Sequence, residues 1–325
     1  MGEDGLLRWL RSRLDPCLIG DDAAVLPAGG PFAVTVDSQI AGVHFLPDLD
    51  PAVLARRLLA VNLSDLAATG AEPAYAFLAL STAPGFDHRR FFRAFLTACR
   101  PSGLVLAGGD LARNPGGTVA TLTLAGRCPE GGRFLDRRGA RAGQALWLGG
   151  TVGEAAAGLR WGARREDPVS RAVAAAARRA VRRHLQPEPQ LALGRWLGLR
   201  APQDQGAAMD VSDGLAIDLR RLCRASGVGA EVWEDALPLP RRFAEICRAL
   251  AVEPLDLALG GGEDYVLLFT LPDGIEPPFP EARRIGRITR SRRLRLRRGN
   301  TWHDLPTLGW DHLATQNAPA GPPGR

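Results

Sequence analysis

The chain has 325 residues, of which 46% are hydrophobic and 23% are charged, and its formal net charge is +6. This length predicts two domains, because a single hydrophobic core rarely serves so many residues. No apolar run reaches the roughly 18 residues that a transmembrane helix needs, so we expect no membrane span. All 41 basic residues are arginine. The absence of lysine excludes P-loop, protein-kinase and Schiff-base sites, so any phosphate chemistry must use metal ions, arginines and backbone amides.

The two ends of the chain differ in their predicted structure. Residues 1–15 have the pattern of a charged amphipathic helix and not of a signal peptide, so we expect a cytoplasmic protein. Residues 317–325, NAPAGPPGR, predict a disordered tail. The five cysteines are widely spaced and never form C-x-x-C, which argues against disulfides and zinc and predicts buried thiols.

The stretch from Asp50 to Pro73 predicts a helix with an inward-facing carboxylate. Asp50 can cap its start, and Gly70 can end it. Asp65 continues the apolar stripe of this helix near its C-terminus, where negative charge is unfavourable. A cation must offset that charge, and both an arginine partner and a metal ion remain open. The stripe consists of Leu54, Leu58, Val61 and Ala68.

Three further acidic positions follow short apolar segments. Asp22 lies in GDDAAV, which predicts either a solvated turn or a metal-binding corner. Asp37 ends the predicted strand 32–37, and Asp110 follows the predicted strand 104–107 after two glycines that would let a ligand approach the backbone. His44, in the loop after Asp37, is either an ordinary loop histidine or a functional one.

Strands and helices alternate along the first half. Predicted strands at 74–81 and 118–126 flank a predicted amphipathic helix at 87–99, which is typical of an α/β protein with mixed sheets. The glycine- and arginine-rich segment 137–143 precedes a new strand, so we place a domain boundary there, with one domain at 1–138 and the other at 139–316.

In the second half, polar residues gather at a predicted strand-to-helix turn. The strand 207–211 is followed by a helix for which Ser212 or Asp213 is the expected N-cap. Together with Asp210, these side chains would suit a phosphate only if metal ions offset the two acids. A triple-glycine turn before Glu263 is a second place where acidic residues lie at a turn next to a predicted strand.

Residues 283–298 contain nine arginines. Leucines alternate with arginines here, which favours an edge strand with one solvated face and hence no nucleic acid. The alternative is an RNA-binding module built on this strand.

The acidic positions together form an oxygen-ligand set without histidine or cysteine, which suits Mg²⁺. Several Mg²⁺ ions beside glycine turns indicate a triphosphate substrate. The set comprises Asp22, Asp37, Asp65, Asp110, Asp210 and Asp213.

Six ordered motifs carry a family resemblance that extends from residue 18 to residue 313. They are GDDAAVL, VDSQIAGVHF, AVNLSDLAATGAEP, GGD, DVSDGL and GGEDYVLLF. In this order and spacing they resemble the thiamine-monophosphate kinase family, within the aminoimidazole ribonucleotide synthetase-like superfamily. The resemblance implies a homodimer of two-domain α/β subunits that pair through their N-terminal sheets, with ATP between the domains. It also implies direct transfer of the γ-phosphoryl group of ATP to thiamine monophosphate, without a phosphoenzyme.

The resemblance also implies roles for individual residues. The six aspartates match Mg²⁺ ligands, with Asp37, Asp65, Asp110 and Asp210 closest to the chemistry. Thr35 and Val36 match two further metal contacts, and valine serves there only if the contact uses the backbone. Gly109, Asp110, Arg137 and Ser212 match ATP contacts, with Arg138 as an alternative to Arg137. His44, Glu263 and Trp310 match thiamine monophosphate contacts, with Trp310 suited to stacking on a flat cationic ring.

Other enzymes of the superfamily are the alternatives. These are aminoimidazole ribonucleotide synthetase itself, selenophosphate synthetase and the hydrogenase-maturation dehydratase. Selenophosphate synthetase would need a reactive cysteine or selenocysteine and a lysine near the N-terminus, and the hydrogenase enzyme would need a C-terminal cysteine. The last cysteine here is Cys247.

Overall fold

The computed structural model describes residues 24–27, 30–163, 169–200 and 206–310. The predicted N-terminal helix, Asp22 and the predicted disordered tail lie outside these residues.

Residues 24–127 form a five-stranded mixed sheet. The strand order is β1-β2-β5-β3-β4, with β3 and β4 parallel and the other neighbours antiparallel. The strands are β1 (Ala24–Pro27), β2 (Pro31–Ile40), β3 (Glu72–Thr82), β4 (Val105–Arg113) and β5 (Val119–Arg127). This arrangement confirms the mixed α/β fold.

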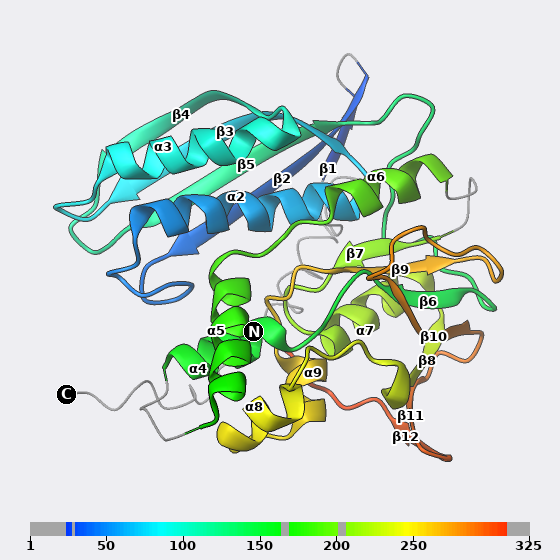
Figure 1. Ribbon diagram of the computed structural model, residues 1–325. Helices are drawn as coiled ribbons and strands as arrows, with labels where there is room; N and C mark the ends of the chain where they lie inside the picture. The colour runs from blue at the N-terminus through cyan, green and yellow to red at the C-terminus, as the bar shows by residue number, and fades with distance from the viewer. Residues whose placement is uncertain (1–23, 28–29, 164–168, 201–205, 311–325) are drawn as a thin grey trace.

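Helices α2 (Pro51–Ala68) and α3 (His88–Cys99) cover one face of this sheet (Figure 1). The Asp50 side chain accepts a hydrogen bond from Ala52 N at 2.8 Å, which confirms the predicted cap of α2. Gly70 ends the helix with a φ of +69°, a conformation that favours glycine.

The second half of the chain builds a seven-stranded sheet with helices packed around it. The strand order is β12-β11-β8-β10-β6-β9-β7. The strands are β6 (Ala145–Leu148), β7 (Ala208–Asp210), β8 (Gly229–Trp233), β9 (Leu267–Leu271), β10 (Arg283–Thr289), β11 (Leu294–Arg298) and β12 (Thr301–Asp304). The helices are α4 (Glu154–Gly162), α5 (Arg171–Leu185), α6 (Leu191–Arg200), α7 (Leu215–Ser226), α8 (Phe243–Ala249) and α9 (Pro254–Gly260), with short 3-10 turns at Arg100–Ser102 and Glu234–Ala236.

Three local predictions were wrong. Asp37 and Asp110 do not end their strands, because β2 continues to Ile40 and β4 to Arg113. The arginine-rich β11 is not an edge strand, because β12 pairs with its outer side. The N-cap of α7 is Gly214, and neither Ser212 nor Asp213 caps this helix.

Helix α2 lies between the two sheets and packs against both halves of the chain (Figure 1). Ala67 and Ala68 at its C-terminal end share a hydrophobic cluster with Leu197 of α6 and Phe269 of β9. A Cβ atom on Gly194 would lie 2.0 Å from Ala67 O, so only glycine allows α6 to approach this closely. The two halves therefore meet along α2.

Cys99, Cys223 and Cys247 are buried free thiols, as predicted, while Cys128 is partly exposed. Within the described residues, no helix combines the length and the apolarity required to cross a membrane.

Candidate active site

Helix α2 directs four polar side chains at the junction between the two halves. Two of them contact β2, one contacts the second half, and one contacts both. They are Arg57, Asn62, Ser64 and Asp65.

The half-buried Asp65 faces β2. Its Oδ2 accepts a hydrogen bond from Thr35 Oγ1 at 2.5 Å. One turn earlier, Asn62 Oδ1 accepts a hydrogen bond from Asp37 N at 3.1 Å. A hydroxyl donor orients the Asp65 carboxylate but leaves its charge in place. The prediction of an inward carboxylate is confirmed, with a neutral donor among its partners.

Side-chain alternation along β2 separates Val36 from this group. Thr35 is buried, whereas Val36 is 58% exposed on the opposite face of the sheet. Val36 therefore has only its backbone to offer a metal ion on the α2 side.

Asp210 connects the seven-stranded sheet to helix α2. It ends β7 and is buried, and its Oδ2 accepts a hydrogen bond from Ser64 Oγ at 2.6 Å. Ser64 and Asp65 are neighbours on α2, so Asp210 and Asp65 approach the junction from opposite sides, each held by a hydroxyl donor.

A buried arginine joins three segments nearby. Arg57 is 1% exposed, and its guanidinium donates to Gln39 Oε1 at 3.0 Å, to the carbonyl of His184 and to Glu263. His184 Nδ1 lies 2.7 Å from the other carboxylate oxygen of Glu263. Both oxygens of Glu263 are thus engaged by this chain, and its predicted contact with thiamine monophosphate remains a prediction.

The environment of Glu263 favours its charged form. Burial raises the pKa of this carboxyl, but the His184 hydrogen bond and the Arg57 charge outweigh burial and lower the pKa to about 2. Glu263 therefore stays ionised at any working pH and holds α2 against the second half.

Three segments of the second half meet beside Glu263: the turn of Glu263 itself, the turn of Ser212 and Asp213, and the segment that ends at Trp310. Glu263 N donates to Ser212 O at 2.6 Å, and Trp310 N donates to Asp213 O at 2.9 Å. Glu263 has a φ of +60°, a strained value for a residue with a side chain, and such strain is common at functional sites. These backbone hydrogen bonds bring Ser212 beside Glu263 and Asp213 beside Trp310.

Asp213 has a cation partner in the chain itself. Its Oδ2 accepts from Arg221 Nη1 at 2.5 Å, and Arg221 also binds Asp218 at 2.9 Å. Asp218 Oδ2 accepts from Asp213 N and Gly214 N at 3.1 and 3.2 Å, and so takes the place of the missing N-cap. Burial raises the pKa of Asp218 to about 7.

Asp264, next to Glu263, is buried and points the other way. It accepts backbone hydrogen bonds from Gly153 N at 2.6 Å and Ala155 N at 3.0 Å, at the start of α4. Burial raises its pKa to about 7 against the opposing effect of these two bonds. Asp264 thus anchors the helix and does not face the junction.

Asp110 is set apart from the other aspartates. It lies on the exposed edge strand β4, while Asp37 lies on β2, and β5 and β3 come between them. Three strand spacings amount to about 14 Å, too far for two carboxylates of one chain to share an ion that takes ligands at about 2 Å. Among the described residues, no three acids, histidines or cysteines are grouped to hold a metal ion.

The glycine before Asp110 has a structural reason. A Cβ atom on Gly109 would lie 2.0 Å from Leu78 O of the neighbouring strand. The expected close approach is therefore made by β3, at a point just after the pairing register shifts between Ala76 and Phe77.

The remaining predicted residues occupy more ordinary positions. His44 Nδ1 accepts from Ile40 N at 3.1 Å, which leaves Nε2 to carry the proton in the neutral ring. Arg138 pairs with Asp136 at 2.9 Å, whereas Arg137 is half-buried and its carbonyl accepts from Ser226 Oγ at 2.7 Å.

Comparison with known proteins agrees with this geometry. Residues 20–128 match the family model described as AIR synthase related protein, N-terminal domain. The chain is 42% identical over 268 residues to the thiamine-monophosphate kinase of Salmonella typhimurium, covering 81% of this chain and 78% of that protein. It is 30% identical to the Aquifex aeolicus enzyme of the same name, covering 89% and 92%. The chain belongs to the thiamine-monophosphate kinase family.

A solved structure of this family has the same fold over nearly the whole chain. It is described as AaThiL complexed with AMPPCP and TMP, with a TM-score of 0.85 and 29% identity over 96% of this chain and 97% of that one.

The sequence analysis missed three residues of the junction in this member of the thiamine-monophosphate kinase family: Arg57, Ser64 and His184. Arg57 had a detectable signal, because it lies three residues after Leu54 and four before Val61, beside the apolar stripe. His184 comes from a distant helix, and no local pattern marked it.

Proposed function

We propose that this protein phosphorylates thiamine monophosphate to thiamine diphosphate with ATP, at the junction between the two halves. The observation that carries the proposal is the pair of hydroxyl-held carboxylates, Asp65 on α2 and Asp210 bonded to its neighbour Ser64, in a chain of this family. A relative with the same fold is described as complexed with AMPPCP, a non-hydrolysable analogue of ATP, and with TMP.

The donor set at the junction fits Mg²⁺. It offers carboxylate and hydroxyl oxygens, and the metal-ligand predictions place no sulfur or imidazole there. Asp37, Asp65 and Asp210 would hold the ions, with Asp22, Thr35, the backbone of Val36 and Asp213 as further ligands. Bound Mg²⁺ would neutralise the charge that develops on the transferred phosphoryl group.

The chain's own residues orient the reactants. Thr35 and Ser64 fix the two carboxylates, and the Arg57–Glu263–His184 network holds the converging turns in place. Direct transfer needs in-line positioning above all, and a rigid, hydrogen-bonded site supplies it.

We assign the substrates to the residues that match the family's substrate contacts. His44, Glu263 and Trp310 would contact thiamine monophosphate, and Trp310 is 43% exposed. Gly109, Asp110, Arg137 and Ser212 would contact ATP. Of the two adjacent arginines we propose Arg137, the position that matches the family's ATP contact, with Arg138 as the alternative.

We also propose a homodimer formed through the five-stranded sheet. The face of this sheet away from α2 and the edge strand β4 expose large apolar side chains, which marks an interaction surface. These are Val36, Phe77, Val105 and Leu111. In this dimer Asp110 would serve the partner's site, since it lies too far from Asp37 of its own chain.

Mixed dimers test the role of Asp110 in trans. Asp65→Asn and Asp110→Asn subunits, each inactive alone, should regain activity when they are unfolded and refolded together, because one site per mixed dimer is then intact. No recovery, with mixed dimers shown by mass, would place Asp110 in its own subunit's site.

The remaining assignments follow from the same picture. We place the domain boundary between residues 138 and 139 and the protein in the cytoplasm. We expect no nucleic-acid partner, because Arg284, Arg287, Arg297 and Arg298 of the arginine-rich segment pair with acidic residues of the chain.

The direct test is an assay with ATP, Mg²⁺ and thiamine monophosphate, with thiamine diphosphate measured by fluorescence after oxidation. Product formation that requires all three supports the proposal, and its absence overturns it. Incubation with γ-labelled ATP and Mg²⁺ alone should leave no label on the protein. Acid-labile label on His44 would replace direct transfer by a phosphoenzyme route.

A further inference from the structure

The arginine-rich segment 283–298 is mostly neutralised by its own chain. Arg283 donates to backbone carbonyls, and the guanidinium of Arg295 lies 5.0 Å from the ring centre of Trp302. Within the described residues, the side chains of Arg290, Arg292 and Arg293 have neither a carboxylate nor a hydrogen-bond acceptor. The uncompensated charge of the segment is thus confined to the turn between β10 and β11.

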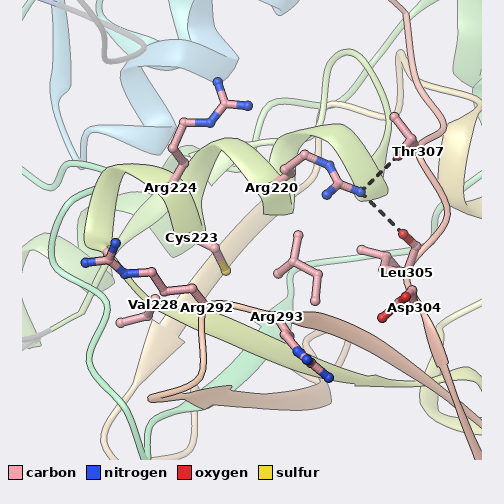
Figure 2. Close-up of a pocket in the computed structure, with 11 residues that line it drawn as sticks. Arg220, Cys223, Arg224, Val228, Arg292, Arg293, Asp304, Leu305 and Thr307 are labelled. Atoms are coloured by element: carbon pink, nitrogen blue, oxygen red, sulfur yellow. Dashed lines mark hydrogen bonds between the residues drawn. The ribbon is translucent and has the colours of Figure 1, made fainter.

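Two of these three arginines line a cavity of about 890 Å³. Figure 2 shows α7 on one side of it, with Arg220 and Arg224, and the turn on the other side, with Arg292 and Arg293. Asp304 is the one acidic residue among those that line it. Four arginines and one aspartate line the pocket, and two of these arginines, Arg292 and Arg293, have no acidic partner among the described residues, so the pocket is cationic and of a size suited to a small molecule.

The arginine turn is held rigidly. Ala230 N donates to Arg293 O at 3.1 Å, and Arg293 N donates to Ser291 O at 2.6 Å. A Cβ atom on Gly229 would lie 2.0 Å from Ser291 O, so β8 accepts the turn only because it has glycine there. A fixed backbone lowers the entropy cost of ordering the two side chains around a ligand.

The wall of the pocket opposite the turn, formed by α7, is also fixed by hydrogen bonds. Arg220 donates to Leu305 O at 3.3 Å and Thr307 Oγ1 at 3.4 Å, shown as dashed lines in Figure 2. The pocket lies at the C-terminal end of α7, where the helix dipole disfavours anions. The guanidinium groups must outweigh that effect, so the affinity of the pocket should depend steeply on each arginine.

The cysteine that lines the pocket cannot act as a nucleophile. Cys223 is buried, and burial raises the pKa of its thiol to about 12, so the nucleophilic thiolate is not formed. The pocket is also separate from the junction, because ten residues of α7 and its N-terminal turn, about 15 Å of helix, separate Cys223 from Asp213.

We propose that this pocket is a second ligand site, for a small molecule bearing a phosphate or diphosphate group. Guanidinium groups bind phosphate oxygens through paired hydrogen bonds, and without lysine this chain relies on arginine for that purpose. Because the wall at Leu305 and Thr307 continues to Trp310, a bound anion would restrain the segment that enters the proposed acceptor site.

Titration calorimetry with inorganic diphosphate tests the proposal, in a chelator so that no divalent ion competes for the diphosphate. Arg292→Ala and Arg293→Ala should each weaken binding about tenfold or more. The matched control is Arg290→Ala, which removes the same charge from the same turn but outside the pocket, and it should change binding less than about twofold. Unchanged melting temperatures would show that all three variants are folded.

Three outcomes would overturn the proposal. One is the absence of binding to the wild-type protein. Another is an equal loss in all three variants, which would indicate diffuse attraction by the turn's charge. The third is tight, salt-sensitive binding of mixed RNA that diphosphate does not displace, since this would make the turn a nucleic-acid surface.

Discussion

Two pairs of aspartates, Asp65 with Asp210 and Asp218 with Asp264, do different work in the molecule. Asp65 and Asp210 accept hydrogen bonds from the hydroxyls of Thr35 and Ser64 at the junction. Asp218 and Asp264 are buried behind it and accept hydrogen bonds from backbone amides near the starts of α7 and α4. Hydroxyl donors orient Asp65 and Asp210. By contrast, both oxygens of Asp264 accept from backbone amides, and Asp218 accepts from two backbone amides at Oδ2 and from Arg221 at Oδ1.

The comparison teaches that the donor distinguishes a site carboxylate from a structural one. Adjacent Glu263 and Asp264 show the same contrast within one turn: Glu263 faces Arg57 and His184, and Asp264 faces the start of α4. Substitutions in the first group should therefore alter activity, and those in the second should alter stability.

The largest expected effect is on turnover in Asp65→Asn. Removing a carboxylate that holds a catalytic ion should lower kcat by about 100-fold or more, because charge stabilisation worth several kcal/mol is lost. The melting temperature should change little, since Thr35 can still donate to the amide oxygen. Steady-state kinetics at saturating Mg²⁺ and a thermal melt measure both quantities.

Asp256→Asn provides the control for this experiment, since Asp256 is an exposed residue in the first turn of α9. Near-normal turnover of Asp65→Asn at saturating Mg²⁺ would move Asp65 into the structural group.

The next largest effect is on stability, through the ion pair at the junction between the halves. Arg57→Met should destabilise the protein by about 3–5 kcal/mol, because it leaves Glu263 charged and partly buried without one of its two partners. Denaturant unfolding measures the loss. Adding Glu263→Gln should recover part of it, and a purely additive double variant would show that the two residues are not coupled.

Asp264→Asn should be less destabilising, by about 1–3 kcal/mol, since the amide group faces one of the two backbone N–H donors at the start of α4 and leaves it unsatisfied. In the refolded or cooled protein, the KM for ATP should be unchanged. A large fall in kcat with normal stability would instead assign Asp264 to the site.

The last effect is on the pH dependence of stability. The folded-state pKa of Asp264 is raised from 3.8 to about 7, so its contribution is fully present below pH 3.8 and is lost as the pH rises through 7. The free energy of unfolding should therefore fall across this interval, by at most about 1.4 kcal/mol per pH unit. Asp264→Asn should flatten that part of the profile, and an unchanged slope would contradict the assignment.

Features that depend on neighbouring residues could be predicted from the sequence. The cap at Asp50 and the stop at Gly70 depend on neighbouring residues, and so does the position of Asp65 on the stripe; all three are present in the structure. The family and its fold were readable because six motifs occur in order. The ends of β2 and β4 were misjudged, because a strand continues for as long as its neighbours can pair with it, and partners distant in the sequence decide that length.

Tertiary structure alone decided what each carboxylate does. The sequence predicted Asp210, Ser212 and Asp213 as one polar cluster and Glu263 in a similar turn, but only the packing of α2 between two sheets brings Ser64 to Asp210 and Arg57 to Glu263. Likewise, the nine arginines of 283–298 look equivalent in the sequence. The fold pairs most of them with groups of the chain and leaves the turn at Arg292 and Arg293 unpaired, because hydrogen bonding depends on which surfaces meet and not on the order of residues.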